Sequence, residues 1–268
     1  MLKDITLGQY FPGESVVHRL DPRTKLLLLI GYIVALFMAE SWISYGLVFA
    51  FLAVTIAISH IPLKSIVRGM KPLVVILLFT AVLNLFFTGG ETKLAEFWGI
   101  TITMEGVLRA IFMVLRILLL ITCTFMLTYT TSPIALTDGL ESLLGPLKKI
   151  KVPVHELSMM MCIALRFVPT LIEETDKIMC AQKARGADFE NGNLLRRVKA
   201  LVPILVPLFI SAFRRADELA TAMECRCYHG GEGRTKMKLL RYKRRDFLAF
   251  ALGLVLFAGV IALAQFGL

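Results

Sequence analysis

The sequence lacks the paired cysteines of a disulfide-stabilised protein. It has five cysteines, an odd number, and most of them lie inside apolar segments. Secreted disulfide frameworks use even numbers of cysteines at recurring spacings, so this pattern favours a reducing environment. The N-terminal segment also lacks an apolar core followed by a small-residue cleavage site. We therefore expect no cleavable signal peptide.

The signatures of catalysis and nucleotide binding are missing as well. The four histidines are scattered, and neither an H-E-x-x-H nor a G-x-S-x-G motif occurs. The glycine-rich stretch GGEGRT (230–235) does not match the phosphate-binding pattern G-x-x-x-x-G-K-[ST]. We expect a protein that is not an enzyme and that binds no cofactor itself.

The sequence does have a large excess of apolar residues. Hydrophobic residues occupy 57% of the 268 positions, whereas a soluble domain has about 45–50%. Five apolar runs approach the ~20 residues that a helix needs to cross a bilayer. The sequence predicts an all-α integral membrane protein with about five transmembrane helices, at 25–40, 42–61, 72–88, 106–130 and 247–268.

The charged residues are distributed unevenly. Residues 131–245 hold 20 Lys/Arg and 12 Asp/Glu, which gives +8 of the net charge of +10. The loop after the second predicted span is basic, whereas the loops on the other side contain Lys93 but also Glu40, Glu91, Glu96 and Glu105. The positive-inside rule then places the N-terminus and residues 131–245 in the cytoplasm. A basic segment beside membrane spans could bind anionic lipid headgroups, an acidic protein or nucleic acid. Positive-inside bias alone explains this charge better than nucleic acid does, so we expect no nucleic acid.

The cytoplasmic segment is predicted to contain long amphipathic helices. Apolar residues recur at i, i+3, i+4 and i+7 in 154–185 and again in 194–227. The apolar centre of the second helix, 201–213, contains Pro203 and Pro207, so we expect it to bend and to be interfacial or buried. A shorter helix is predicted at 132–144, with Ser132 as its N-cap. The predicted organisation is an N-terminal membrane region with four spans (1–130), a cytoplasmic helix region (131–245) and a C-terminal span (246–268).

The two long helices end with similar sequences. TDKIMCAQKARGADF (175–189) aligns without a gap with ADELATAMECRCYHG (216–230), and Arg185 then matches Arg226. Small residues flank both arginines, namely Ala184 and Gly186 in the first copy and Cys225 and Cys227 in the second. Small neighbours let a helix end enter a groove on another protein, where a guanidinium can pair with a carboxylate. The alternative is that each arginine only complements the helix macrodipole.

Two further groups of residues have the composition of possible binding sites. Cys225, Cys227 and His229 lie close in sequence, but structural zinc sites need four ligands and usually Cys-x2–4-Cys spacing, so we expect no metal. Arg109 and Arg116 lie on one face of the fourth predicted span. An arginine inside a membrane is costly, so we expect Arg109 to reach the interface and Arg116 to pair within the bundle. Binding of a partner or an anion is the alternative for Arg116.

Taken together, these features resemble the transmembrane T-component of energy-coupling factor (ECF) transporters, the EcfT/CbiQ family. The resemblance is carried by HRLDPRTKLLLL (18–29), QKARGADF (182–189) and AMECRCYHGGEGRTKMKLL (222–240). Family members commonly have Ala-Arg-Gly at both helix ends, whereas the second end here is Cys225-Arg226-Cys227.

The resemblance implies a non-catalytic coupling subunit of an ECF-type ABC importer in the plasma membrane of a prokaryote. Two ABC ATPase subunits, which bind ATP and Mg, would each accept one of the arginines Arg185 and Arg226. One or more S-components would bind a vitamin or another micronutrient and contact the amphipathic faces of the coupling helices. The residues implied for this contact are Met160, Ala164, Val168, Leu205, Phe209 and Phe213. The alternatives are a membrane-anchored scaffold and a conventional ABC permease with its own substrate pathway.

Overall fold

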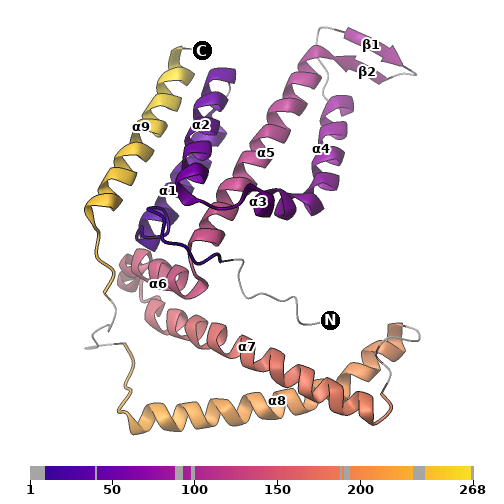
Figure 1. The fold of residues 1–268 in the computed structure, drawn as a ribbon, viewed down its shortest axis with the longest axis vertical. Coiled ribbons are helices and arrows are strands. Elements are labelled where there is room, and N and C mark those ends of the chain that lie inside the picture. Colours follow the sequence, from indigo (N-terminus) through magenta and orange to yellow (C-terminus); the bar gives the residue numbers. More distant parts are fainter. Residues whose placement is uncertain are drawn as a thin grey trace. The chain divides into compact units, whose positions relative to one another are not determined.

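The computed structural model describes residues 10–39, 41–87, 93–97, 100–187, 189, 194–231 and 239–266. Glu40, Glu91 and most of GGEGRT lie outside these residues. The described chain is helical apart from one two-stranded hairpin (Figure 1). The α-helices are α1 (Pro22–Met38), α2 (Trp42–Ser59), α3 (Leu63–Met70), α4 (Val74–Phe87), α5 (Met104–Thr130), α6 (Pro133–Leu143), α7 (Val154–Ala184), α8 (Leu194–Cys225) and α9 (Arg244–Phe266). The 3-10 helices are η1 (Lys71–Leu73) and η2 (Gly145–Ile150), and the strands are β1 (Lys93–Phe97) and β2 (Ile100–Thr103).

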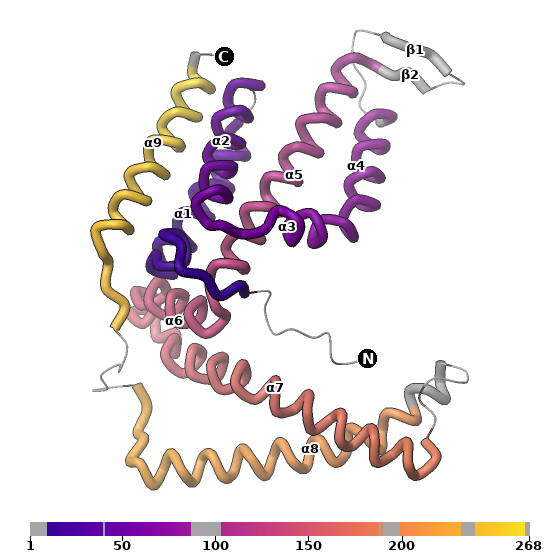
Figure 2. The backbone as a smooth tube through the Cα atoms, in the orientation of Figure 1, coloured from indigo at the N-terminus to yellow at the C-terminus, as the bar shows by residue number. Residues whose placement is uncertain are grey.

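The chain divides into two compact units. The bundle unit, Gly8–Gly139 with Leu240–Leu268, contains α1 to α5 and α9, and the α7–α8 unit contains Leu140–Leu239. Figure 2 shows α1, α2, α5 and α9 packed side by side within the bundle unit. Their facing sides form one apolar core, which includes Tyr32, Leu36, Val48, Tyr129 and Val260.

Four of the five predicted spans coincide with long apolar helices, namely α2, the run Leu63–Phe86 that joins α3 to α4, α5 and α9. The first predicted span corresponds to α1, which has 17 residues and is therefore about 25 Å long, against a hydrocarbon core of ~30 Å. Among the residues that the structure describes, the fifth helix that is long and apolar enough to cross a membrane is α7. The prediction of an all-α membrane protein with about five spans is confirmed, but the set of candidate helices differs by one.

The three helices predicted between residues 131 and 227 are present. The Oγ of Ser132 accepts a hydrogen bond from the backbone N–H of Ala135 at 3.3 Å, as the predicted N-cap of α6 requires. α8 continues through Pro203 and Pro207, and Figure 1 shows its first turns inclined to the rest of the helix. A proline removes one backbone hydrogen bond and its ring crowds the preceding turn, so a bend here has a physical cause.

Among the α-helices and strands, two features have no counterpart in the sequence prediction. The first is the antiparallel hairpin of β1 and β2, in which Phe97 pairs with Ile100. The second is α3. The 3-10 helix η1, which contains Pro72, lies between α3 and α4, and the two helices run in different directions (Figure 1). α3 lies close against α5, because a Cβ atom at Gly69 would lie 2.9 Å from the ring of Phe125.

A buried polar junction at one end of the bundle unit is built by the Leu-Asp-Pro-Arg-x-Lys sequence. Asp21 caps α1, because its Oδ1 accepts the backbone N–H of Arg23 at 3.0 Å. Asp246, in the first turn of α9, accepts the backbone N–H of Asp21 at 2.8 Å through Oδ1 and that of Lys243 at 2.7 Å through Oδ2. The Asp246 carboxylate therefore joins the starts of two helices, and it does so by bonding to Asp21, which lies 225 positions away in the sequence.

Two cations complete this junction. Lys25 is 7% exposed, and its Nζ donates a hydrogen bond to the carbonyl oxygen of Thr130, at the end of α5, at 2.8 Å. Arg23 donates to the carbonyl oxygen of Leu240 at 2.7 Å, and its guanidinium lies over the ring of Tyr242. Removing one member of such a buried set leaves the others without compensation, so each is expected to be costly to replace.

We expect Asp246→Asn to destabilise the protein by about 3–5 kcal/mol. The carboxylate accepts hydrogen bonds from two backbone N–H groups, one on each oxygen. Asparagine has one acceptor oxygen and one NH2 group, so its NH2 group would face one of these backbone N–H groups, and two donors cannot form a hydrogen bond. Thermal unfolding of the purified protein in detergent measures the effect. Asp217→Asn, at an exposed position of α8, is the matched control and should not change the melting temperature. If Asp246→Asn also left the melting temperature unchanged, the polar junction would not be the contact that stabilises the packing of α1 and α9.

Candidate functional site

α7 ends in a Schellman motif, and Arg185 is the residue at its C-cap. The backbone N–H of Gly186 donates to Lys183 O at 3.0 Å, and that of Ala187 donates to Gln182 O at 3.0 Å. Gly186 has a φ of 85°, the left-handed conformation that this motif needs at the first residue after the C-cap.

α8 ends with the same hydrogen bonds around Arg226. The backbone N–H of Cys227 donates to Glu224 O at 2.9 Å, and that of Tyr228 donates to Met223 O at 3.0 Å. Cys227 has a φ of 54° and so takes the place of Gly186. The residues that align in the sequence therefore make equivalent bonds, and both arginines occupy the same position in the motif.

Cys227 adopts the glycine conformation although it has a side chain. A left-handed conformation costs an L-residue roughly 1–2 kcal/mol, whereas glycine adopts it without a steric cost. The departure from Ala-Arg-Gly at the second helix end therefore changes the stability of the cap but not its geometry.

We expect Cys227→Gly to stabilise the protein by about 1 kcal/mol, because glycine relieves this strain. Gly186→Ala should destabilise it by a similar amount for the same reason. Thermal unfolding in detergent measures both changes. Cys225→Gly lies inside the last turn of α8 and serves as the control, with an expected loss of about 0.5–1 kcal/mol. A lower melting temperature for Cys227→Gly would show that the thiol contributes more than the backbone strain costs.

Arg185 and Arg226 are both exposed. Within the described residues, neither guanidinium makes a hydrogen bond, an ion pair or a ring contact. Three other arginines, Arg23, Arg116 and Arg215, are instead engaged with groups of the same chain. The two predicted coupling arginines thus remain available for groups outside the chain.

α7 and α8 cross each other within the α7–α8 unit. Arg215 of α8 donates through Nη2 to Glu174 Oε2 of α7 at 2.9 Å, and Ile204 of α8 is only 5% exposed. Figure 1 shows that the C-terminal ends of the two helices lie on opposite sides of this crossing. Arg185 and Arg226 therefore belong to two separate surfaces.

The segment that follows Arg226 packs back onto the start of α7. Nδ1 of His155 lies 3.1 Å from Glu141 Oε1, and Ser158 Oγ donates to Glu141 Oε2 at 2.9 Å. A Cβ atom at Gly231 would lie 2.5 Å from Cδ2 of His155, so only glycine fits here without displacing the ring. The contact fixes the exit of α8 against the rest of the unit.

The apolar faces predicted on α7 and α8 are uncovered. Met160 is 54% exposed, and Leu205, Phe209 and Phe213 are 49%, 60% and 70% exposed. Ala164 is exposed and Val168 is half-buried. Further exposed apolar residues on these two helices are Leu157, Met161, Leu201, Val202, Val206 and Ile210. An apolar surface of this extent marks a place of contact with protein or lipid.

Arg116 is paired inside the bundle unit, as expected. Its Nε donates to the hydroxyl oxygen of Tyr45 at 2.9 Å, and its Nη2 donates to the carbonyl oxygen of Ala39 at 3.1 Å. Ala39 is the C-cap of α1, so the guanidinium satisfies a carbonyl at a helix end. Arg109 is exposed, which is consistent with a side chain that reaches the interface.

The cysteines and the histidine at the end of α8 do not converge. His229 Nδ1 lies 2.9 Å from the backbone oxygen of Cys227, and Cys225 and Cys227 are free and exposed. Among the residues that the structure describes, no group of three or more His, Cys, Asp or Glu side chains could hold a metal ion.

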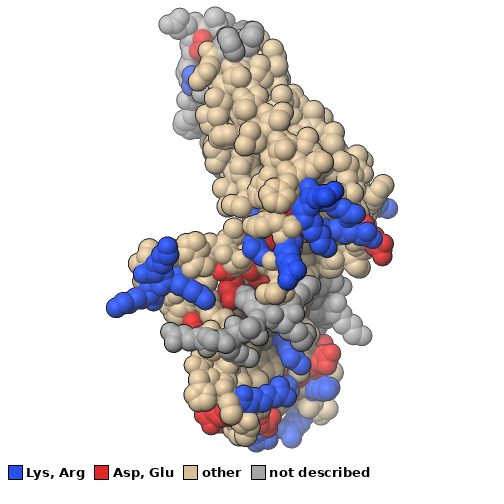
Figure 3. All heavy atoms as spheres, turned by 90° about the vertical axis from the view of Figure 1, so that its left-hand side faces the viewer, with Lys and Arg blue, Asp and Glu red and all other residues tan. Residues whose placement is uncertain are grey.

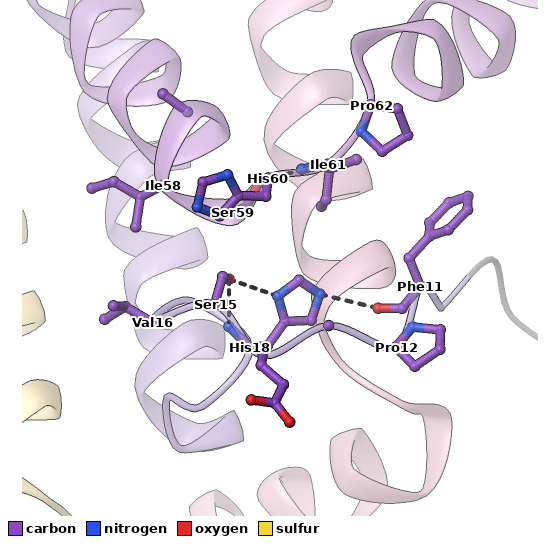
Figure 4. A pocket seen from close by; sticks show the side chains of 13 residues that line it. Phe11, Pro12, Ser15, Val16, His18, Ile58, Ser59, His60, Ile61 and Pro62 are labelled. Carbon is purple, nitrogen blue, oxygen red and sulfur yellow. Dashed lines mark hydrogen bonds between the residues drawn. The ribbon is translucent and has the colours of Figure 1, made fainter.

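A cavity of about 870 Å³ lies between the segment before α1 and the C-terminal end of α2 (Figure 4). Nε2 of His18 lies 3.0 Å from Phe11 O, and Nδ1 lies 2.7 Å from Ser15 Oγ. Burial lowers the pKa of His18 and so disfavours the charged ring, while both nitrogens lie within hydrogen-bonding distance of groups in the same segment. His18 thus holds the wall of the cavity in place, a role that its isolated position in the sequence did not indicate.

The fold and the two helix ends define a helical membrane subunit that presents two arginines on separate surfaces. Residues 13–237 match the family described as CbiQ, cobalt transport protein. The chain is 56% identical to the energy-coupling factor transporter transmembrane protein EcfT of Clostridium kluyveri, over 96% of this chain and 95% of that protein. It is 54% identical to the protein of the same name from Acidaminococcus fermentans, over 98% and 97% of the two chains. The protein of this name from Lactococcus lactis is 47% identical, over 92% and 93%.

The chain belongs to the EcfT/CbiQ family of transmembrane components of energy-coupling factor transporters. It is thus a multi-pass membrane protein and a non-catalytic transporter subunit. The resemblance carried by the three stretches at 18–29, 182–189 and 222–240 is confirmed.

Proposed function

We propose that this chain couples ATP hydrolysis by two ABC ATPase subunits to the uptake of a vitamin or another micronutrient through a separate S-component. The observation that carries the proposal is the matching pair of Schellman motifs, each with an exposed arginine at the C-cap. A single cation at a helix C-terminus is explained by the helix macrodipole. The macrodipole does not require the same residue at the same position of the same motif in both helices.

Each arginine enters a groove on one ATPase subunit. The small residues Ala184, Gly186, Cys225 and Cys227 allow the helix end to approach the groove closely. Inside a groove that excludes water, the guanidinium forms two parallel hydrogen bonds to a carboxylate, a pairing that suits arginine better than lysine. Arginine is also among the residues that contribute most to interface affinity.

The crossing of α7 and α8 transmits the movement. The helices have 31 and 32 residues and are therefore each about 45–48 Å long. When ATP brings the two ATPase subunits together, the two arginine-bearing ends move relative to each other. The Arg215–Glu174 ion pair, which joins the two helices, carries this movement to the apolar faces, as in other rigid-body transitions.

The apolar faces of α7 and α8 bind the S-component. Met160, Ala164 and Val168 lie along α7, and Leu205, Phe209 and Phe213 lie along α8. An S-component is itself a membrane protein with an apolar surface, so burial of these side chains supplies the affinity. ATP and Mg bind the ATPase subunits, and this chain binds no cofactor.

In this proposal the N-terminus is in the cytoplasm of a prokaryotic cell, and α1, α2, the α3–α4 run, α5 and α9 cross the plasma membrane. α7 lies at the cytoplasmic face, although its length and composition allow a span. Only residues 157–165 separate Glu156 from Arg166, an uncharged run of about 14 Å. That run is short of the ~30 Å hydrocarbon core.

We expect the double substitution Arg185→Glu with Arg226→Glu to leave the protein in the membrane but to abolish its complex with the ATPase subunits. The reversed charge would face the carboxylates that the arginines now pair with, and unlike a truncation it adds repulsion. The measurement is co-purification of ATPase subunits with the tagged chain from native membranes, together with ATP-dependent uptake.

The control is Arg166→Glu with Arg214→Glu, which reverses two exposed arginines on the same two helices, away from their ends. This variant should retain the ATPase subunits. A stoichiometric ATPase complex with the Arg185/Arg226 variant would contradict the proposal, and it would favour a scaffold or a permease that docks through other residues.

We expect Phe209→Ala with Phe213→Ala to weaken S-component binding at least tenfold, because each buried aromatic side chain contributes roughly 1.5–3 kcal/mol. The ATPase subunits should remain bound. Co-purification of both kinds of partner measures the difference. Phe209→Leu with Phe213→Leu keeps the surface apolar and should retain most of the binding. Equal loss of ATPase and S-component in the alanine variant would show that the face supports the fold of α8 rather than one partner.

A further inference from the structure

The bundle unit contains an apolar groove of about 480 Å³ between α2 and α9, with α1 and α5 contributing to its wall. This volume lies within the ~300–1,000 Å³ typical of small-molecule sites. The lining is almost wholly aliphatic and aromatic, and the cations Lys25 and Arg245 are part of it. Its position differs from that of the coupling arginines and of the apolar faces on α7 and α8.

The groove exists because α2 and α9 pack closely at one end and diverge at the other. Val48 and Val260 are fully buried, and a Cβ atom at Gly259 would touch Leu47. Towards the start of α9 the two helices separate (Figure 1). There Val54 and Leu252 are 57% and 54% exposed, and both line the groove. Among the described residues nothing covers these rim positions, so the groove is open along its side.

The charges lie on one side of this opening only. Lys25 is already engaged with Thr130 and Thr131. Arg245 is exposed, and within the described part of the chain it makes no ion pair. Arg241, Lys243 and Arg244 beside it are exposed as well. Figure 3 shows a cluster of Lys and Arg where the apolar surface of the bundle unit ends. The nearby carboxylate, Asp246, is buried and accepts two backbone hydrogen bonds, so it does not neutralise this cluster at the surface.

We propose that this groove binds an anionic phospholipid of the surrounding bilayer, with one acyl chain between α2 and α9 and the phosphate at Arg245. An apolar groove with cations at one end matches an amphiphile that has an apolar tail and a charged head. Basic residues next to a membrane span attract anionic lipids, and a guanidinium offers a phosphate two parallel hydrogen bonds. The bilayer supplies this ligand at high local concentration. The inference rests on the groove and its charges and is independent of the coupling proposal.

The test uses the full-length chain purified in detergent and mixed with equal amounts of phosphatidylglycerol and phosphatidylcholine. Native mass spectrometry then counts the lipid molecules that each variant retains. We expect one phosphatidylglycerol to remain bound preferentially. Arg245→Ala should reduce its affinity about fivefold, the effect of roughly one basic residue at an anionic membrane surface. Leu252→Trp should remove binding of either lipid, because the indole fills the groove.

Each variant has a matched control on α9. Arg244→Ala removes an equal charge one residue away, and Val255→Trp places the same bulk at an exposed position that does not line the groove. Both controls should behave as wild type. Equal effects of Arg244→Ala and Arg245→Ala, or retention of the lipid by Leu252→Trp, would overturn the proposal. So would a lipid that is bound by the isolated chain and absent from the complex with its partner subunits, because the groove would then be a protein contact.

Discussion

The carboxylate of Asp246 is the contact on which the bundle unit depends most. The first N–H groups of a helix have no partner within the helix, and near the hydrocarbon core water does not reliably supply one. Asp246 accepts the N–H of Asp21 before α1 and the N–H of Lys243 before α9. Two helix starts therefore share one acceptor group, and neither can move without leaving the other unsatisfied.

The same junction explains why the N-terminal Leu-Asp-Pro-Arg-x-Lys sequence contains so many charges. Asp21, Arg23 and Lys25 contribute one negative and two positive charges, and Asp246 brings the sum to zero. All four side chains are committed to other groups of the chain. This sequence is therefore structural, and its charges are not available to a ligand. The junction also fixes the first turn of α9, and with it the position of Arg245 beside the groove.

Local sequence signals predicted the long helices and their ends, because those signals act over a few residues. Ser132 before Pro133 indicated the start of α6, and the gapless alignment of 175–189 with 216–230 indicated that two helices end alike. The partner of Asp21 could not be predicted, since it lies 225 positions away and no periodicity connects the two residues. The groove was missed for a similar reason, because it arises from the divergence of two helices that are individually unremarkable. The hairpin at 93–103 left only a faint signal, the alternation of Ile and Thr in 100–103.

Exposure alone does not distinguish a surface that meets lipid from one that meets protein, but the spacing of charges does. α9 has no charged residue after Asp246, so its uncharged run of about 30 Å matches the hydrocarbon core. In α8 the uncharged run lies between Lys199 and Arg214 and is only about 21 Å long. A helix with so short a run crosses the core only if a bounding charge is satisfied inside the fold, because burying an unpaired charge is costly. Lys25 of α1 is satisfied in this way by Thr130 and Thr131. Lys199 and Arg214 are instead exposed and make no ion pair within the described residues. The exposed phenylalanines of α8 are therefore better satisfied by a partner that lies along the helix than by lipid on all sides. This argues that the α7–α8 unit is completed by other subunits of the transporter, whereas the bundle unit is completed by the bilayer.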